Sequence, residues 1–352
     1  MKILFIGGTG TISTAISRKL LESGHELYLI NRGNRNGELE KAAQAGGGKL
    51  IPLVCDILDE AAAARLLENM HFDCAADFIA FRPEQLERDY RLLKGKTAQF
   101  IFISSASAYQ KLPSNYRITE GTPLANPYWE YSRNKIACED FLMKKYRDDG
   151  FPVTIVRPSH TYDERSIPLG VHGNCGSWQV AQRMLDGKPV IIHGDGTSLW
   201  TMTHNSDFAR AFIGLAGNIR AIGEAVNITS DETLTWNQIY QCIADALGVP
   251  LKAVHVSSEF LAAAGTYDYT GSLTGDKANS VVFDNTKLKQ LVPGFCAVKR
   301  FDEGCRETVQ YVLAHPELQR KDPEFDEWSD RVIQAVVTAA GAVRNGQMVK
   351  TE

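Results

Sequence analysis

The strongest constraint on the fold lies at the N-terminus, where a short apolar run leads into a glycine-rich turn. Lys2–Ile6 has the composition of a buried strand, and Gly7-Gly8-Thr9-Gly10-Thr11-Ile12-Ser13 follows it directly. The apolar residues beyond the turn recur at helical spacing; they are Ile12, Ile16, Leu20 and Leu21. A strand, a glycine turn and a helix in this order are the context of a loop that binds phosphate groups. The sequence therefore predicts a parallel α/β fold that begins with a dinucleotide-binding loop.

The residues of this loop have distinct expected roles. Gly7 and Gly10 allow a tight turn and a close approach of the backbone to a pyrophosphate. Thr11 and Ile12, at the start of the helix, are further candidate cofactor contacts. Ser13 stands where a third glycine is usual, and a residue of this size still permits close packing of helix on strand.

The next strand, Glu26–Ile30, completes a βαβ unit, and the residues after it bear on the choice of cofactor. NAD-selective folds usually place an acidic residue there, which binds the ribose 2′-hydroxyl. This chain has Asn31 instead, followed by Arg32 and Arg35. Without a carboxylate a 2′-phosphate is not repelled, and guanidinium groups can bind it bidentately. The segment favours NADP(H) over NAD(H), and a basic surface loop is the alternative.

Two further strands lead into candidate binding residues. Leu50–Val54 precedes Asp56 and Ile57, and Asp56 can either accept a hydrogen bond from an adenine amino group or cap a helix. Phe100–Ser104 runs into Ser105-Ala106-Ser107-Ala108-Tyr109, at the strand end where ligands of open α/β sheets bind. A serine hydroxyl there can donate to a substrate oxygen, although serines at strand ends are also ordinary turn formers.

Tyr131 and Lys135 have the order and spacing of an alcohol–ketone redox site. On a helix, residues four apart lie on one face, so that phenol and ammonium can point into one pocket. A free tyrosine has a pKa of about 10, and a nearby ammonium lowers that pKa by favouring the phenolate. Such a tyrosine can exchange a proton with a substrate hydroxyl while hydride moves at the carbon. A half-exposed helix with a solvated lysine is the alternative.

Together these motifs resemble an extended short-chain dehydrogenase/reductase of the NAD-dependent epimerase/dehydratase family. The resemblance runs from Met1 to about His315 and includes further segments: Val156-Arg157-Pro158, His193–Thr197, Asp207–Ala211, Ala225–Ile228 and Phe301–Gly304. It implies that Tyr131 is the catalytic base, that Lys135 holds the nicotinamide ribose and that Ser105 orients the substrate, with help from Ser107. It also implies cofactor contacts from residues near the strand ends: Ala80, Ser104, Tyr131, Lys135 and Pro158.

The chain departs from the family pattern where substrates are held. Trp200 stands near the place of an arginine that grips a sugar-nucleotide diphosphate, shortly before His204. Ala106-Ser107 replaces the Asp-Glu pair of the dehydratases, and Asp89 is the nearest residue to the usual active-site asparagine. In these respects the chain is closer to the atypical branch with the chloroplast stem-loop-binding proteins. Trp200 and His204 are candidate substrate contacts, although tryptophans are as often core anchors and histidines more often structural.

Composition favours a cytoplasmic enzyme. The 352 residues carry a net charge of −4 with both signs interspersed, so that no electrostatic footprint for nucleic acid is expected. No apolar run approaches membrane-spanning length, and the first apolar residues are too few for a signal peptide. Seven dispersed cysteines indicate reduced thiols and argue against a zinc site. A small-molecule substrate is the expected partner, and a homodimer is compatible with the sequence.

The pattern of segments predicts a Rossmann-type doubly wound parallel sheet with a smaller C-terminal α+β substrate lobe. We expect a dinucleotide-binding domain over 1–165, which segments at about 190–230 rejoin, and a substrate lobe over 166–320. Residues 321–352 are expected to form a C-terminal helix, centred on 332–343, and a frayed tail. Residues 261–280 have few apolar side chains and predict a mobile loop.

The resemblance implies an NAD(P)-dependent oxidoreductase or epimerase that acts on a hydroxyl or ketone of a sugar or sugar derivative. The substitution at Trp200 favours a sugar, glycoside or polyol over a nucleotide sugar. A nucleotide-sugar 4-epimerase remains an alternative. A nucleic-acid-binding or regulatory protein that uses the fold as a scaffold is another, because a fold does not fix a function.

Overall fold

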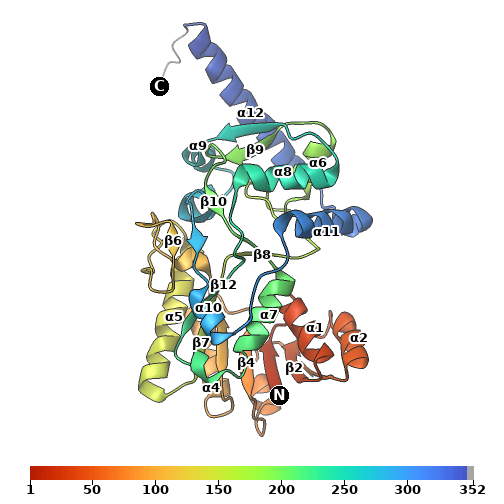
Figure 1. Cartoon of the computed structure of the whole chain (residues 1–352), viewed down its shortest axis with the longest axis vertical. Helices are drawn as coiled ribbons and strands as arrows, with labels where there is room; N and C mark the ends of the chain where they lie inside the picture. Colours follow the sequence, from red (N-terminus) through yellow and green to blue (C-terminus); the bar gives the residue numbers. More distant parts are fainter. Residues whose placement is uncertain (347–352) are drawn as a thin grey trace. The chain divides into compact units, whose positions relative to one another are not determined.

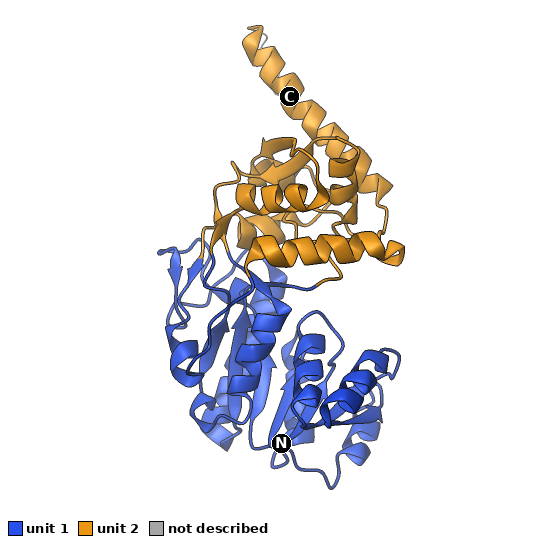
Figure 2. Cartoon of the chain, turned by 45° about the vertical axis from the view of Figure 1, so that its right-hand side comes forward, with its two compact units in different colours: residues 1–163, 201–232, 282–299 blue, residues 164–200, 233–281, 300–352 orange. Residues whose placement is uncertain are grey.

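The computed structural model describes residues 1–346, which divide into two compact units (Figure 2). Unit 1 consists of residues 1–163, 201–232 and 282–299, and unit 2 consists of residues 164–200, 233–281 and 300–352. The chain therefore passes between the units several times, and each unit is assembled from segments far apart in the sequence.

Unit 1 is built on a parallel seven-stranded sheet of order β12-β7-β5-β4-β1-β2-β3 (Figure 1). Its strands are β1 (Lys2–Ile6), β2 (Glu26–Asn31), β3 (Lys49–Val54), β4 (Cys74–Asp77), β5 (Phe100–Ile103), β7 (Val153–Pro158) and β12 (Ala225–Ile228). The central strands are near-continuous apolar runs because helices cover both faces of the sheet. The strand order reverses between β1 and β4, and ligands of open α/β sheets bind beyond the carboxyl ends of the strands at such a point. This sheet confirms the predicted Rossmann-type fold class.

Helices fill both faces of this sheet and form two separate cores. One core joins β1 to α1, α2, α7 and α10, and the other joins β5 and β7 to α3, α4 and α5. The helical segments are α1 (Ser13–Glu22), α2 (Gly37–Gly46), α3 (Glu60–Leu66), α4 (Pro83–Leu93), η1 (Ala106–Ala108), α5 (Glu130–Asp149), α7 (Asn205–Leu215), η2 (Ile219–Ala221) and α10 (Thr286–Leu291). Two small parallel pairs complete the unit: β6 (Arg117–Ile118) with β15 (Val282–Phe283), and β8 (His160–Tyr162) with β11 (Met202–His204).

Unit 2 is mainly helical. Its helical segments are α6 (Trp178–Leu185), α8 (Trp236–Leu247), α9 (Ser258–Ala263), the π-helical η3 (Thr270–Lys277), α11 (Phe301–Ala314), η4 (Pro316–Leu318) and α12 (Pro323–Arg344). Its short strand pairs are β9 (Val190–His193) with β14 (Ala253–Val256), and β10 (Leu199–Trp200) with β13 (Leu234–Thr235). Trp236 and Tyr240 on α8 are fully buried and anchor the core of this unit.

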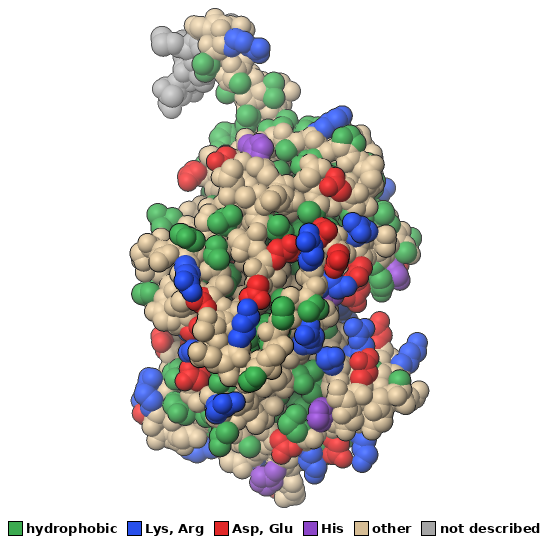
Figure 3. Space-filling view, in the orientation of Figure 1, with side chains coloured by type: hydrophobic (Ala, Val, Ile, Leu, Met, Phe, Trp, Pro, Cys, Tyr) green, Lys and Arg blue, Asp and Glu red, His purple; other side chains and the backbone are tan. Residues whose placement is uncertain are grey.

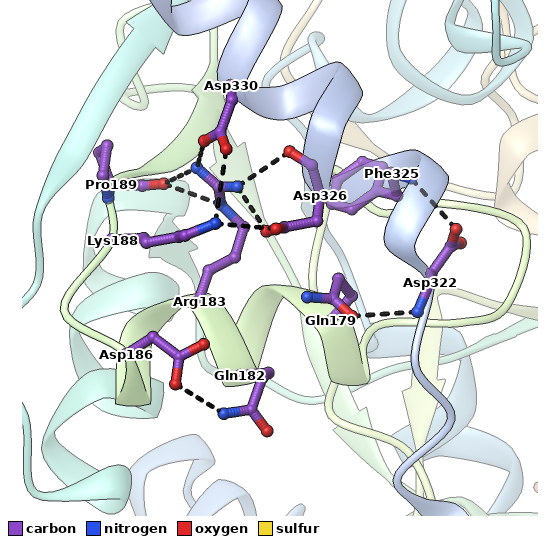
Figure 4. Close-up of polar contacts among 10 residues, drawn as sticks. All are labelled: Gln179, Gln182, Arg183, Asp186, Lys188, Pro189, Asp322, Phe325, Asp326 and Asp330. Carbon is purple, nitrogen blue, oxygen red and sulfur yellow. Dashed lines mark hydrogen bonds and ion pairs between the residues drawn. The ribbon is translucent and has the colours of Figure 1, made fainter.

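Ion pairs attach α12 to the rest of unit 2 (Figure 4). The guanidinium of Arg183 on α6 is buried and binds Asp326 at 2.6 Å and Asp330 at 2.7 Å. Lys188 adds a bond to Asp326 at 2.8 Å. At the start of the helix, the Asp322 carboxylate accepts a hydrogen bond from the Phe325 N–H. The second half of α12 extends beyond the other elements of unit 2 (Figure 1).

Three expected segments differ in the structure. Residues 261–280 are not one loop, because α9 and η3 occupy much of this range and bury Leu261, Tyr269 and Leu273. Strand β4 ends at Asp77, so that Ala80, expected near a strand end, lies three residues beyond it in the following turn. The helix expected over 332–343 is the second half of the longer α12. The predicted frayed tail lies largely in residues 347–352, outside the described residues.

Candidate active site

The glycine turn after β1 has two different steric requirements. Gly7 has a φ of +81°, and a Cβ at this position would lie 2.8 Å from Ile79 Cγ2, so that the fold itself needs glycine there. At Gly10 the nearest protein atom to such a Cβ is Ser13 Oγ at 3.6 Å. The protein therefore has space for a side chain at Gly10, and a glycine there leaves the N-terminus of α1 open to a ligand.

Ser13 has a role of its own in this turn. Its buried hydroxyl accepts a hydrogen bond from the Gly10 N–H at 2.9 Å. Thr11 is exposed and Ile12 is half-buried immediately before α1. The turn thus presents the exposed Gly10 and Thr11 just before the helix N-terminus, as a pyrophosphate site requires.

The loop after β2 is ordered by Asn31. Its Oδ1 accepts from the Gly33 N–H at 2.8 Å, and its Nδ2 donates to Asn36 Oδ1 at 2.7 Å. Both side-chain ends of Asn31 are therefore engaged within the loop. The side chains of Arg32 and Arg35 are exposed beside it.

Asp56 and Ile57 follow β3. Asp56 Oδ1 accepts from the Leu58 N–H at 3.0 Å, whereas the cap of α3 is Asp59, whose carboxylate accepts from the Ala62 N–H. The alternative role of Asp56 as a helix cap is therefore wrong, because it closes the turn that precedes the helix. The side chain of Ile57 is buried in the core beneath this turn.

Lys135 joins the ends of two strands at the proposed active site. It lies on the second turn of α5, and its buried ammonium donates to the carbonyls of Ala80 at 2.8 Å and Ile103 at 2.7 Å. Burial lowers the pKa of Lys135 to about 8, although neighbouring acidic groups oppose the shift. The Nζ atom lies 5.8 Å from the ring centre of Tyr131, one helical turn earlier. The structure therefore brings the predicted Tyr–Lys pair together at the carboxyl edge of the sheet.

Three serine hydroxyls form a chain next to this pair. Ser132 Oγ donates to Ser107 Oγ at 2.7 Å, and Ser107 Oγ lies 2.9 Å from Ser105 Oγ. Ser132 and Ser107 are buried, whereas Ser105 is half-buried at the outer end of the chain. In such a chain each hydroxyl polarises the next, which strengthens donation by the outer one. Sequence reasoning missed Ser132, although it directly follows Tyr131.

Ser104 takes part in a different, buried network. Its hydroxyl donates to Glu139 Oε1 at 2.5 Å, and the same carboxylate binds Arg157 with two bonds of 3.0 and 2.5 Å. Arg157 also donates to the Tyr109 hydroxyl at 3.0 Å. Burial raises the pKa of Tyr109 to about 12, so that this tyrosine is a structural donor and not a base. Pro158, the next residue after Arg157, ends β7.

Two aromatic side chains flank Tyr131 and were not recognised in the sequence. The Trp129 ring centre lies 4.9 Å from that of Tyr131, and the Phe81 ring centre lies 6.2 Å from it. Phe81 is 46% exposed, and Trp129 is half-buried at the start of α5. The position of Phe81 directly after Ala80 was the only signal in the sequence. These rings give the surroundings of Tyr131 an aromatic, partly open character.

The predicted substrate contacts Trp200 and His204 both interact with other residues of the protein. Trp200 is buried in unit 2, and its ring centre lies 5.6 Å from that of Trp236. This packing matches the core-anchor alternative. His204 lies in unit 1, where its Nδ1 accepts from the Ser206 N–H at 3.2 Å and caps α7.

The comparison with known families decides the assignment of the chain. The sequence pattern of the NAD dependent epimerase/dehydratase family matches residues 3–229, which is more than half of the chain. The chain belongs to this family. Family membership agrees with the motifs of unit 1: the glycine turn, the strand-end serines, Tyr131 and Lys135 all lie within the matched range.

Relatives in this family have diverse descriptions. The 2′-dehydrokanamycin reductase of Streptomyces kanamyceticus is 24% identical over 84% of this chain and 80% of that protein. The chloroplast stem-loop binding protein of 41 kDa b of Arabidopsis thaliana is 28% identical over 71% of this chain and 64% of that protein. The structure of UDP-glucose 4-epimerase from Bifidobacterium longum, in complex with NAD+ and UDP, has a TM-score of 0.70 and 19% identity over 90% of this chain and 99% of that one. At this identity the structural likeness shows a shared fold.

Further features of this epimerase/dehydratase family member concern membrane-spanning helices, metal sites and surface charge. Within residues 1–346, no helix is both long and apolar enough to cross a membrane. The same residues contain no group of three or more His, Cys, Asp or Glu side chains that could hold a metal ion. On the face shown in Figure 3, acidic and basic side chains are interspersed and form no large patch of one sign.

Proposed function

We propose that this protein is an NAD(P)-dependent oxidoreductase or epimerase that acts on a hydroxyl or ketone of a sugar or sugar derivative. The observation that carries the proposal is the position of Lys135. Its buried ammonium is fixed by the carbonyl of Ile103, which ends β5, and by that of Ala80, in the turn after β4. It lies one helical turn from Tyr131, at the edge where ligands of parallel sheets bind. An ammonium that is buried against carbonyls and not paired directly with a carboxylate is costly, which favours a functional reason for its presence.

The side chains have the following proposed roles. Tyr131 removes the proton from the substrate hydroxyl, and the ammonium of Lys135 favours the phenolate form that does so. Ser105, at the outer end of the hydroxyl chain, donates to the substrate oxygen and holds it beside Tyr131. Ser107 and Ser132 support that donation from behind.

The residues fit a dinucleotide, because Gly10 leaves the α1 N-terminus open in a turn where the protein does not itself require glycine. The backbone of Gly7, Gly10, Thr11 and Ile12 would hold the pyrophosphate, and Lys135 the nicotinamide ribose. Such a cofactor supplies hydride acceptance and donation when bound. Further proposed cofactor contacts come from the strand ends: Asn31, Asp56, Ile57, Ala80, Ser104 and Pro158.

A preference for NADP(H) is a finer part of this proposal. It rests on Arg32 and Arg35, which are exposed beside the loop ordered by Asn31, at the end of β2. No carboxylate follows β2 to bind a ribose 2′-hydroxyl. Related structures were solved with NAD, so that a direct comparison of the two dinucleotides is the required test.

The aromatic rings beside Tyr131 support a ring-shaped substrate. Trp129 and Phe81 can pack on the apolar face of a sugar while the hydroxyl faces Tyr131. A relative described as a 2′-dehydrokanamycin reductase acts, by that description, on a ketone of a sugar-derived compound. We therefore propose free sugars, glycosides or polyols as the substrate class and nucleotide sugars as the competing class.

Two measurements test this function. Mass spectrometry of the purified protein identifies any retained dinucleotide; retention indicates an epimerase, which returns hydride to the same molecule, and its absence indicates a reductase. A screen of sugars, glycosides and nucleotide sugars then follows dinucleotide absorbance for redox and chromatography for epimerisation. Turnover confined to UDP- or dTDP-sugars would contradict the proposed substrate class. No dinucleotide binding at all would contradict the enzymatic proposal and favour a scaffold role.

A further inference from the structure

A buried cluster of charged side chains lies behind the turn that binds Lys135. Asp77 ends β4, and Arg88 and Asp89 lie on α4; all three are buried. Arg88 Nη2 binds Asp89 Oδ1 at 2.6 Å and Asp77 Oδ2 at 3.3 Å, and Arg88 Nε also binds Asp89 Oδ1. One guanidinium thus faces two carboxyl groups in an almost fully buried place.

The two carboxyl groups have different surroundings. Asp89 Oδ2 is buried and has no hydrogen-bond donor among the described residues. Burial, and next the negative charge of Asp77, raise the pKa of Asp89 well above its ordinary value. Asp77 has the opposite surroundings, because its carboxylate accepts from two backbone N–H groups as well as from Arg88. Asp77 therefore receives hydrogen bonds on both carboxylate oxygens, whereas only Oδ1 of Asp89 receives any, from Arg88.

Asp77 is linked to Lys135 through one short turn. Asp77 Oδ1 accepts from the N–H groups of Ile79 at 2.5 Å and Ala80 at 2.7 Å. The carbonyl of Ala80, in the same turn, accepts from the Lys135 ammonium at 2.8 Å. The carboxylate that fixes the turn thereby fixes one of the two oxygens that hold Lys135.

Asp77 is one of several acidic groups that act on the Lys135 ammonium. Three acidic groups act on its ammonium: the Cys138 thiol and the carboxylates of Asp77 and Glu139. Burial raises the pKa of Cys138 to about 12, so that the thiol is neutral at the pH at which Lys135 titrates. Glu139 is bonded twice to Arg157, whereas Asp77 has one longer bond of 3.3 Å to Arg88, so that the charge of Glu139 is offset more strongly. The rings of Phe81, Phe102 and Tyr131 also lie near the ammonium.

We propose that Asp77 is a positioning residue for Lys135, with Asp89 as the holder of the cluster's proton. Asp77 fixes the Ile79–Ala80 turn and supplies the buried negative charge that keeps Lys135 protonated. The protonated Asp89 carboxyl accepts hydrogen bonds from Arg88 and adds no second negative charge. This inference deepens the proposed function, since it rests on the cofactor-binding role of Lys135, but it makes a claim about Lys135 itself that needs no substrate.

Two nearly isosteric variants separate the charge of Asp77 from its shape. In Asp77→Asn the amide oxygen can still accept from the two N–H groups, so that the turn is retained while the charge is lost. Asp89→Asn is the matched control, because it replaces a neutral carboxyl on the same cluster. The titration of Lys135 is followed by NMR of protein with 13C-labelled lysine, with its signal assigned by its loss in Lys135→Met.

The expected results differ in sign and size. The parent and Asp89→Asn should titrate at nearly the same pH, whereas Asp77→Asn should titrate lower by about one pH unit or more. Should Asp77→Asn fail to fold, Arg88→Gln removes the opposing positive charge and should move the Lys135 titration upward. Equal titrations in the parent and Asp77→Asn, or equal shifts in both Asn variants, would overturn the proposal.

A second readout separates this inference from the proposed function. The affinity for NADP(H) is measured as a function of pH. As the pH rises, this affinity should begin to fall at a lower pH in Asp77→Asn than in Asp89→Asn. If the Lys135 titration shifts but dinucleotide affinity does not follow it, Asp77 controls Lys135 and the cofactor role of Lys135 is wrong. If neither moves, the positioning role of Asp77 is wrong and the proposed function is unaffected.

Discussion

The replacement of Gly10 by valine tests the dinucleotide site most directly. A Cβ at Gly10 meets no protein atom closer than 3.6 Å, and the residue does not have a positive φ. Folding should therefore tolerate the change. The branched side chain would, however, occupy the space in front of the α1 N-terminus where a pyrophosphate must approach. Loss of even one charge-assisted hydrogen bond costs about 1.5–3 kcal/mol, or roughly tenfold to a hundredfold in affinity.

Isothermal titration calorimetry with NADP(H) and NAD(H) measures this loss, and thermal denaturation verifies folding. Gly341→Val is a matched control, because Gly341 lies on α12 in unit 2, has no positive φ, and a Cβ added there would meet no atom within 4 Å. It should bind dinucleotide as the parent does. Gly8→Val provides the contrast, since a Cβ there would lie 2.3 Å from Leu29 Cδ1 and should impair folding itself. If folded Gly10→Val binds as tightly as the parent, the assignment of the loop is wrong.

Four other substitutions have defined outcomes. Arg32→Ala should remove most of a preference for NADP(H), a loss of roughly tenfold to a hundredfold in NADP(H) affinity, and equal affinity of the parent for both dinucleotides in calorimetry would contradict this. Tyr131→Phe should abolish turnover while dinucleotide affinity is retained, and unchanged turnover in a steady-state assay would refute the proposed base. Lys135→Met should weaken both turnover and dinucleotide affinity, and it should also change how the stability of the protein depends on pH. Because the folded-state pKa of Lys135 is about 8 and its unfolded value is about 10.4, the unfolded state binds more protons between these values. The free energy of unfolding of the parent should therefore contain a contribution that rises from about pH 8 to 10. This rise should be absent when Lys135→Met is measured by urea denaturation. Arg183→Met removes the buried guanidinium, but the side chains of Asp326 and Asp330 are 23% and 53% exposed and still bond to Lys188. A loss of roughly 1–3 kcal/mol is therefore expected in the same measurement.

The elements best predicted from the sequence are those whose signal is local. Strand β1 was predicted with its observed bounds because an uninterrupted apolar run is bounded by a charged residue and a glycine. Segment 261–280 was wrongly predicted as a loop, since its helical turns depend on three buried anchors, Leu261, Tyr269 and Leu273, spaced among glycines and threonines. Burial of those anchors is a tertiary effect that no local pattern reveals.

In the candidate site, too, local contacts follow from the sequence and tertiary contacts do not. Tyr131 and Lys135 are four residues apart on one helix, so their proximity follows from helical geometry alone. The contacts of Arg157 with Glu139 and Tyr109 join residues 18 and 48 positions apart, and only the folded sheet brings them together. Trp200 illustrates a different limit, because residue type alone does not distinguish a tryptophan that stacks on a ligand from one that packs on Trp236.

Buried charge is concentrated where the proposed chemistry takes place. The buried ion pairs of unit 1 include those of Arg88 with Asp77 and Asp89, and of Arg157 with Glu139. Both adjoin the carboxyl ends of β4, β5 and β7, and between them lies the ammonium of Lys135. Apolar residues of similar volume are often at least as stabilising as a buried ion pair. Stability alone therefore does not explain these buried charges. A site that must keep Lys135 protonated and hold the Ser104 hydroxyl in one orientation does explain them.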